Sequence, residues 1–192
     1  MVTLNRIYTR AGDGGKTRLA TGEPLAKDHP RVAAYGSVDE TNACLGLARL
    51  HSQGDPHLDA MLSRIQNDLF DLGADLATPE RDKPLPFEPL RITEGQVQRL
   101  EREIDEINAE LSPLESFILP AGTALSAHLH LARTVCRRAE REAVTLQGLP
   151  DETVSPEAIK YLNRLSDLLF VASRRANDRG KADVLWKPGA TR

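Results

Sequence analysis

Apolar residues recur every three or four positions along most of this chain, which is the periodicity of amphipathic helices. In residues 57–76 these apolar positions are Leu58, Met61, Leu62, Ile65, Leu69, Leu72 and Leu76. A third block alternates steps of three and four, and its apolar positions are Val97, Leu100, Ile104, Ile107 and Leu111. The pattern as a whole predicts five helices, over about residues 32–51, 57–76, 94–111, 121–146 and 156–179.

Segments rich in proline and glycine separate the predicted helices. They read TPERDKPLPFEPLRI, SPLESFILP and GLPDETVSP, and a Gly-rich stretch precedes the first helix. Thr93 and Gln96 have the spacing of a capping box at the start of the third helix. We therefore predict an all-α chain that forms one domain over residues 1–192: an up-and-down five-helix bundle over 31–180, preceded by a Gly-rich N-terminal arm over 1–30.

The composition agrees with a helical protein and excludes several classes of partner. Aromatic residues make up 4% of the chain, whereas sheets concentrate aromatic and β-branched residues. The net charge of -3 provides no basic field for nucleic acid. No apolar run approaches 18 residues, and the first ten residues lack the apolar core of a signal peptide. These features predict a cytoplasmic protein that binds neither nucleic acid nor membrane. Cys44 and Cys136 lie among small apolar residues, where buried inert thiols are the usual case.

The arm contains TRAGDGGKTRL, in which GGKT resembles the end of a P-loop. A P-loop needs a glycine five residues before Gly15, where this chain has Arg10, and no βαβ pattern follows. Glycines still allow backbone N–H groups to approach an anion closely. The groups available around it are the glycines Gly12, Gly14 and Gly15, the cations Arg10, Lys16, Arg18 and Lys27, and the hydroxyls of Thr9 and Thr17. The stretch predicts a phosphate-binding loop, and a flexible, solvated arm is the alternative interpretation.

Polar rows lie beside the apolar stripes of the fourth and fifth helices. The apolar stripe of the fourth helix is Leu125, Leu129, Ala132, Cys136, Ala139 and Ala143. Arg133, Arg137 and Glu140 form one row about 80° from this stripe, where a cleft, a subunit interface or an ordinary solvated surface would lie. On the fifth helix, beside the core stripe Leu162, Leu165, Leu169 and Ala176, a second row consists of Asn163, Ser166 and Phe170. This row is consistent with a ligand wall or with contact to a second subunit.

Several familiar catalytic patterns are absent from the sequence. It has no Glu-x-x-His pair of the kind that binds di-iron centres, and no set of Cys or His with metal-ligand spacing. His128 and His130 are predicted to point to different faces of the fourth helix. No Ser/His/Asp or Cys/His nucleophile arrangement can be identified. An enzyme with this sequence would therefore depend on charge and on positioning of its substrates.

Five segments resemble, in the same order, those of the PduO-type ATP:cob(I)alamin adenosyltransferases. They are YTRAGDGGKTRL, SVDE, SFILP, RTVCRRAERE and YLNRLSDLLF, and together they extend over nearly the whole chain. One departure is Ala121, where the family pattern has glycine. The resemblance implies an enzyme that transfers the 5′-deoxyadenosyl group of ATP to the cobalt of cob(I)alamin, giving adenosylcobalamin and triphosphate. It also implies a homotrimer whose substrates meet between neighbouring subunits.

The resemblance further implies a role for individual residues. The implied ATP site consists of Thr9, Arg10, Ala11, Gly12, Asp13, Gly15, Lys16, Thr17, Arg18, Lys27, Arg137, Arg138, Ala139, Glu140, Arg141 and Asn163. The implied catalytic residues are Phe117, Asp39, Arg133 and Arg137, with Asp39 paired to Arg133 across the subunit boundary. Phe117 and Phe170 would line the lower face of the corrinoid. Mg²⁺ would be bound through ATP rather than by protein side chains, and partners would include a reductase and a B12-dependent acceptor enzyme.

Two alternatives accompany this interpretation. A large apolar side chain in a loop often fills its own helix bundle, so Phe117 could be a core plug rather than a wedge against cobalt. The whole chain could instead be a non-catalytic helical module that binds a nucleotide or a corrinoid. A P-loop phosphotransferase is a weaker third alternative because of Arg10.

Overall fold

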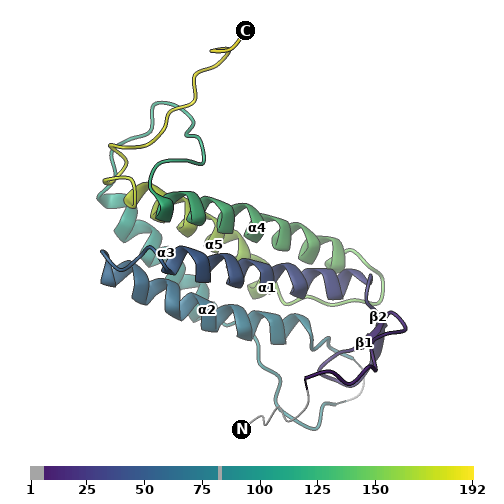
Figure 1. The fold of residues 1–192 in the computed structure, drawn as a ribbon. Helices are drawn as coiled ribbons and strands as arrows, with labels where there is room; N and C mark the ends of the chain where they lie inside the picture. The colour runs from purple at the N-terminus through teal and green to yellow at the C-terminus, as the bar shows by residue number, and fades with distance from the viewer. Residues whose placement is uncertain (1–6, 82–83) are drawn as a thin grey trace.

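The computed structural model of this chain describes residues 7–81 and 84–192, so residues 1–6 of the predicted arm lie outside the described residues. The described helices are α1 (Pro30–Arg49), α2 (Pro56–Leu76), α3 (Glu94–Ala109), α4 (Ala124–Gln147) and α5 (Pro156–Arg175), and they pack as an up-and-down bundle (Figure 1). The predicted five-helix fold is confirmed.

The helix starts follow from their caps. Thr93 and Gln96 form the predicted capping box of α3. Thr123 accepts a hydrogen bond from the backbone N–H of Ser126, so α4 begins at Ala124 and not at 121. The predicted end of the fifth helix at 179 is also wrong. Asp178 and Arg179 have φ values of 50° and 53°, which are left-handed and end the helix at Arg175.

Two short strands were not predicted from the sequence. β1 (Lys16–Arg18) pairs antiparallel with β2 (Pro24–Ala26), with Lys16 opposite Ala26 and Arg18 opposite Pro24. A strand of three residues is too short to show the alternation of apolar and polar residues by which strands are recognised in a sequence. The Gly-rich arm is therefore a small hairpin that precedes α1.

The core contains the predicted apolar stripes. Every predicted stripe residue of α2 and α4 is buried. Cys136 is completely buried and its Sγ lies 3.3 Å from the carbonyl oxygen of Leu162. Burial raises the pKa of the Cys136 thiol far above its usual value, as expected for an inert thiol. On α5, Ala176 is only partly buried because it follows the last helical residue.

Helices α1 and α4 run antiparallel. The rings of His51, just after the end of α1, and His128, near the start of α4, stack with their centroids 5.2 Å apart. Figure 1 shows the β1–β2 hairpin at one end of the bundle and the loop before α4, together with the C-terminal tail, at the other. None of the described helices has the length and hydrophobicity needed to cross a membrane.

Candidate functional site

The arm folds into a basic loop. The backbone N–H groups of Asp13 and Gly15 donate to the carbonyl oxygens of Arg10 and Gly12, at 3.3 and 3.2 Å, and the N–H of Lys27 donates to the carbonyl of Gly15 at 2.9 Å. Gly15 has a φ of 76°, which favours glycine at this turn. Arg10 also has a positive φ of 61°, and its guanidinium carbon lies 5.7 Å from the centre of the Tyr8 ring.

This loop encloses a hollow of about 510 Å³. The hollow is lined by Thr9, Ala11, Gly12, Lys16, Thr17, Arg18, Pro24 and Lys27. Seven of the predicted ATP residues are therefore brought together, whereas Arg10, Asp13 and Gly15 do not line the hollow. A Cβ atom at Gly12 would lie 3.0 Å from the Lys27 Nζ, so glycine keeps this ammonium close to the loop backbone. Three cations and two hydroxyls around one hollow suit a polyanion.

A second group of predicted residues lies along α4. Glu140 accepts a hydrogen bond from the Asn163 Nδ2 of α5 at 2.9 Å, which brings the two predicted polar rows together. The Arg137 carbonyl accepts from Arg141 Nη1 at 3.1 Å, and both arginines are exposed. Arg138 instead turns towards α1 and pairs with Glu40 at 2.5 Å. A further predicted residue, Ala139, is completely buried in the core, so its side chain does not face this row.

A third group surrounds a larger, mostly apolar hollow of about 680 Å³ at the opposite end from the arm. It is lined by Leu114, Glu115, Ser116, Phe117, Ile118, His130, Arg133, Phe170, Trp186 and Pro188. The Phe117 side chain is 78% exposed, which excludes the alternative that it plugs its own bundle. Its ring meets the ring of Trp186 edge to face, with centroids 6.0 Å apart. The predicted Phe117, Phe170 and Arg133 thus share one hollow.

The C-terminal tail, which sequence reasoning missed, forms one wall of this apolar hollow. The backbone N–H of Trp186 donates to the Phe117 carbonyl at 2.8 Å, and that of Leu119 donates to the Val184 carbonyl at 2.7 Å. Ser116 Oγ adds a bond to the Trp186 carbonyl at 3.1 Å. The tail has no apolar periodicity. The only signal in the sequence was its tryptophan, the single one in the chain.

His130 is the second residue that sequence reasoning missed. It is buried at the wall of the apolar hollow, 6.3 Å from the Phe170 ring centre, and its Nδ1 accepts from Arg133 Nε at 3.3 Å. Its Nε2 has no hydrogen-bond partner among the described residues. Burial lowers the pKa of His130, and the charge of Arg133 lowers it further. Burial likewise lowers the pKa of Arg133, with the charge of Arg137 as a second cause.

Asp39 lies apart from its predicted partner. It is exposed on the outward side of α1, and no ion pair joins it to Arg133 within the described chain. Helical geometry explains the separation, because Asp39 faces away from the core of α1 while Arg133 lies on the side of α4 next to α5.

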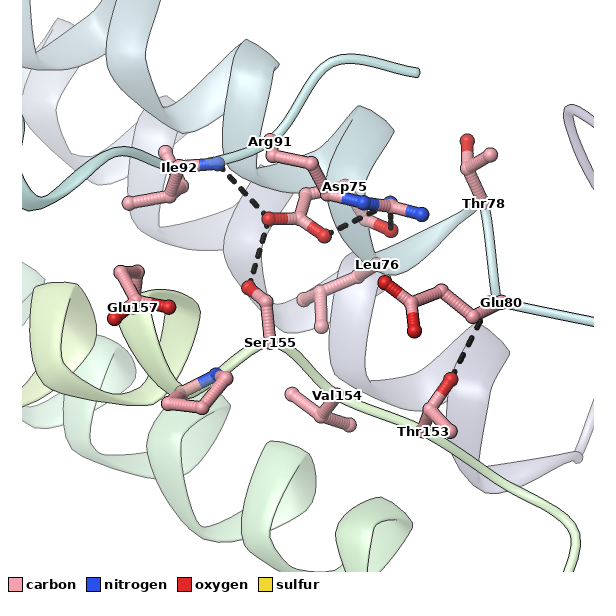
Figure 2. A pocket seen from close by; sticks show the side chains of 11 residues that line it. Asp75, Leu76, Thr78, Glu80, Arg91, Ile92, Thr153, Val154, Ser155 and Glu157 are labelled. Carbon is pink, nitrogen blue, oxygen red and sulfur yellow. Dashed lines mark hydrogen bonds and ion pairs between the residues drawn. The ribbon is translucent and has the colours of Figure 1, made fainter. Parts of the chain in front are cut away.

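A further hollow of about 430 Å³ lies at the arm end of the bundle and was not predicted (Figure 2). The carboxylate of Asp75 lines this hollow. It accepts hydrogen bonds from Ser155 Oγ and from the backbone N–H of Ile92, both at 2.9 Å, and pairs with Arg91 at 3.0 Å. These bonds satisfy the hydrogen-bonding capacity of the Asp75 carboxylate.

Over residues 7–81 and 84–192, no group of three or more His, Cys, Asp or Glu side chains could hold a metal ion.

Comparisons with known proteins agree with one another. Residues 7–176 match the family model described as cobalamin adenosyltransferase. The chain is 51% identical over 191 residues to the corrinoid adenosyltransferase of Mycobacterium tuberculosis strain H37Rv, covering 100% of this chain and 97% of the relative. It is 42% identical over 189 residues to the corrinoid adenosyltransferase of Bacillus subtilis strain 168, covering 96% and 94%.

The chain is also similar to solved structures of adenosyltransferases. One is a Phe-to-Ala variant of a PduO-type ATP:corrinoid adenosyltransferase from Lactobacillus reuteri, complexed with cobalamin and ATP. It matches with a TM-score of 0.82 and 40% identity, covering 95% of this chain and 99% of that chain. An Arg-to-Lys variant of the same type of enzyme from Lactobacillus reuteri, complexed with ATP, matches with a TM-score of 0.81 and 41% identity, covering 94% and 100%.

Proposed function

This chain belongs to the cobalamin adenosyltransferase family, and we propose that it transfers the 5′-deoxyadenosyl group of ATP to the cobalt of cob(I)alamin. The products are adenosylcobalamin and triphosphate. ATP is the co-substrate and the corrinoid is the acceptor. The observation that carries this function is the apolar hollow, where the exposed Phe117 lies together with Phe170 and with Arg133, the first arginine of the polar row on α4.

The reaction needs no protein base. Cobalt in the Co(I) state is already a strong nucleophile, so the corrinoid supplies the reactive centre and the protein orients the two substrates. In-line attack on the ribose 5′ carbon forms the cobalt–carbon bond and breaks the bond from this carbon to the triphosphate oxygen. Holding the two substrates in line can contribute about 7–11 kcal/mol. The lack of a nucleophile constellation in the sequence is consistent with this chemistry.

The residues of the chain divide the remaining work. Lys16, Arg18 and Lys27 of the arm would bind the triphosphate, and Arg137 would stabilise it as charge builds on the leaving group. The exposed ring of Phe117 would occupy the lower face of the corrinoid, excluding a lower axial ligand and making cobalt easier to reduce. Phe170 would pack against the same face. Mg²⁺ would accompany ATP through its phosphate oxygens.

The positions of the two hollows favour the predicted homotrimer. The arm lies beyond the end of α4 at Gln147, and about 20 Å of helix separates this end from Arg133. One chain therefore does not bring its own arm to its own apolar hollow. Two different surfaces that meet head to tail close into a ring if the rotation permits, and a trimer is such a ring.

The outward face of α1 supplies a surface for this contact. Beside Asp39 it carries small and apolar residues, including Ala43, Leu47 and Leu50, of which the two leucines are 45% and 69% exposed. The centres of subunit interfaces are more apolar than the rest of a protein surface. We assign this face to a second copy of the chain, whose Arg133 would pair with Asp39.

We further propose that residues 1–192 act as one adenosyltransferase domain, with residues 1–30 as the ATP-binding arm and 31–180 as the bundle. A reductase would supply Co(I), a B12-dependent enzyme would accept the product, and the protein would act in the cytoplasm.

An anaerobic assay with ATP and chemically reduced cobalamin tests the function. We expect the absorbance spectrum of cob(I)alamin to convert to that of adenosylcobalamin, with no conversion when ATP is omitted. A protein that binds both ligands without converting them would instead be the non-catalytic binding module.

A further inference from the structure

A buried ion pair lies where the arm meets the bundle. Arg31, in the first turn of α1, is 1% exposed, and its Nη2 lies 2.6 Å from the Glu152 Oε2 of the α4–α5 loop. The same guanidinium donates to the carbonyl oxygens of Leu76, at 2.5 Å, and Thr153, at 2.8 Å. One buried side chain therefore joins the start of α1 to the end of α2 and to the α4–α5 loop.

The pair continues outwards to the hairpin. Arg81 Nη1 lies 3.3 Å from Glu152 Oε2 and donates to the Asp151 carbonyl at 3.0 Å. The other nitrogens of this guanidinium, Nε and Nη2, reach the two carboxylate oxygens of Glu23 at 3.3 and 3.4 Å. Glu23 comes directly before β2. The series Arg31, Glu152, Arg81 and Glu23 thus runs from the core to the hairpin, and we call it the arm junction.

The two loops that carry the arm junction are also fixed to each other. Thr153 Oγ1 accepts a hydrogen bond from the backbone N–H of Glu80 at 3.2 Å, which joins the α4–α5 loop to the α2–α3 loop (Figure 2). Asp75 joins Ser155 and Ile92 of the same two loops. These bonds hold the backbones of the two loops together, so the loops that carry Arg81 and Glu152 are fixed to the bundle where they contact the arm.

The hairpin itself needs such a support. A two-stranded hairpin with strands of three residues is not stable alone, and its other links to the bundle are few. The described ones include the burial of Leu19 and a 3.2 Å hydrogen bond from the Ala20 N–H to the Ala77 carbonyl. At the exit of the hairpin, His29 caps α1 and its Nε2 lies 3.6 Å from Glu152 Oε1. The arm junction therefore contacts both the turn of the hairpin and its exit.

We propose that the arm junction positions the ATP arm, so that Arg81 and Glu152 set the affinity for ATP without touching it. This inference rests on the proposed function, because it assigns the hollow of the arm to the triphosphate. Lys16, Arg18 and Lys27 all belong to the segment that the junction holds. A small displacement of that segment separates the cations from the phosphates and weakens binding. Arg81 and Glu152 are thus positioning residues.

Arg81→Gln tests the arm junction while leaving the buried pair of Arg31 and Glu152 intact. We expect the KM for ATP to rise about two- to five-fold, the effect that a partly exposed ion pair supports. The KM for cobalamin should not change, because none of the four residues of the arm junction lines the apolar hollow. Glu23→Gln should also raise the KM for ATP. The double variant should be no worse than Arg81→Gln alone, because Arg81→Gln already removes the pair with Glu23.

Arg49→Gln is the matched control. Arg49 pairs with Asp59 at 3.0 Å, its side chain is 31% exposed like that of Arg81, and it lies at the opposite end of the bundle. We expect a lower melting temperature with an unchanged KM for ATP. The inference is overturned if Arg81→Gln leaves the KM for ATP unchanged. It is also overturned if Arg49→Gln raises that KM equally, or if the KM for cobalamin rises in parallel.

Amide hydrogen exchange of the free protein separates this inference from the proposed function. Arg81→Gln should speed exchange at the Ala20 and Lys27 amides about two- to five-fold and leave the Trp186 amide unchanged. This result would support the arm junction even if the wild-type protein transferred no adenosyl group. Unchanged exchange at Ala20 and Lys27 would refute it in either case.

Discussion

Replacing Phe117 with alanine removes the ring that stands in the apolar hollow. The ring is 78% exposed in the free chain, so the bundle loses little support when it is removed. A fully buried phenylalanine costs about 3–5 kcal/mol on truncation to alanine. With about a fifth of this side chain buried, we expect a cost of about 1 kcal/mol or less, which lowers the melting temperature by about 2–4 °C at this chain length.

The exposed surface gives the size of the effect on turnover. Roughly 150 Å² of this ring is free to pack against a corrinoid, which corresponds to about 3–5 kcal/mol of apolar contact. If this contact excludes the lower axial ligand, its loss should slow turnover about 100- to 5000-fold when Co(II) must be reduced on the enzyme. Supplying cobalamin already reduced to Co(I) should restore much of the rate.

The assay compares both forms of cobalamin in wild type, Phe117→Ala and a control. Phe70→Ala is the control because Phe70 is 72% exposed on α2 and lies outside the apolar hollow. We expect it to change neither rate. Equal losses with Co(II) and Co(I) for Phe117→Ala, accompanied by a large fall in melting temperature, would refute the role of the ring against cobalt.

Three further predictions concern charged residues. Arg137→Ala should raise the KM for ATP about ten-fold or more and lower turnover, because a charge-assisted contact to phosphate contributes about 1.5–3 kcal/mol. The control is Arg102→Ala, because Arg102 is exposed on α3. Unchanged kinetics in a folded Arg137→Ala variant would show that Arg137 is an ordinary solvated surface residue. Arg133→Ala and Asp39→Ala should each convert the proposed trimer to smaller species in light scattering, and a wild-type protein that is monomeric at micromolar concentration contradicts the trimer. Burial raises the pKa of the Glu152 carboxyl, but Arg31 and Arg81 lower it more, so the net pKa lies below 4.5. The ion pairs of Glu152 therefore stabilise the fold above pH 4.5, and this stability is lost as the pH falls through the lowered pKa. Below pH 4.5 the melting temperature of Glu152→Gln should fall less steeply with decreasing pH than that of the wild type. Equal slopes for the two proteins would refute the pairing.

Helices were predictable because their periodicity is local. The stripes of α2 and α4, and the capping box at Thr93, are encoded in residues a few positions apart. The short strands were not predictable, since three residues define no alternation. Asp178 and Arg179 end α5 by adopting left-handed backbone angles, which their residue types do not require.

The part of the site that one segment supplies was the easiest to predict from the sequence. The basic hollow of the arm comes from one contiguous segment, and all its lining residues except Pro24 were predicted from the sequence. The apolar hollow combines Phe117 with His130 and Trp186, which lie far apart in the chain and meet only through folding. Arg31 and Glu152 are separated by 121 positions, and their pairing leaves no local pattern. The proposed pairing of Asp39 with Arg133 would join two copies of the chain.

The products of turnover test the central claim most directly. Phosphorus NMR and absorbance should be followed together in an anaerobic mixture of the protein, ATP and cob(I)alamin. Attack at the 5′ carbon keeps all three phosphates together, so we expect one intact triphosphate for each adenosylcobalamin formed. ADP and phosphate as the principal products, or triphosphate released without formation of adenosylcobalamin, would contradict adenosyl transfer to cobalt.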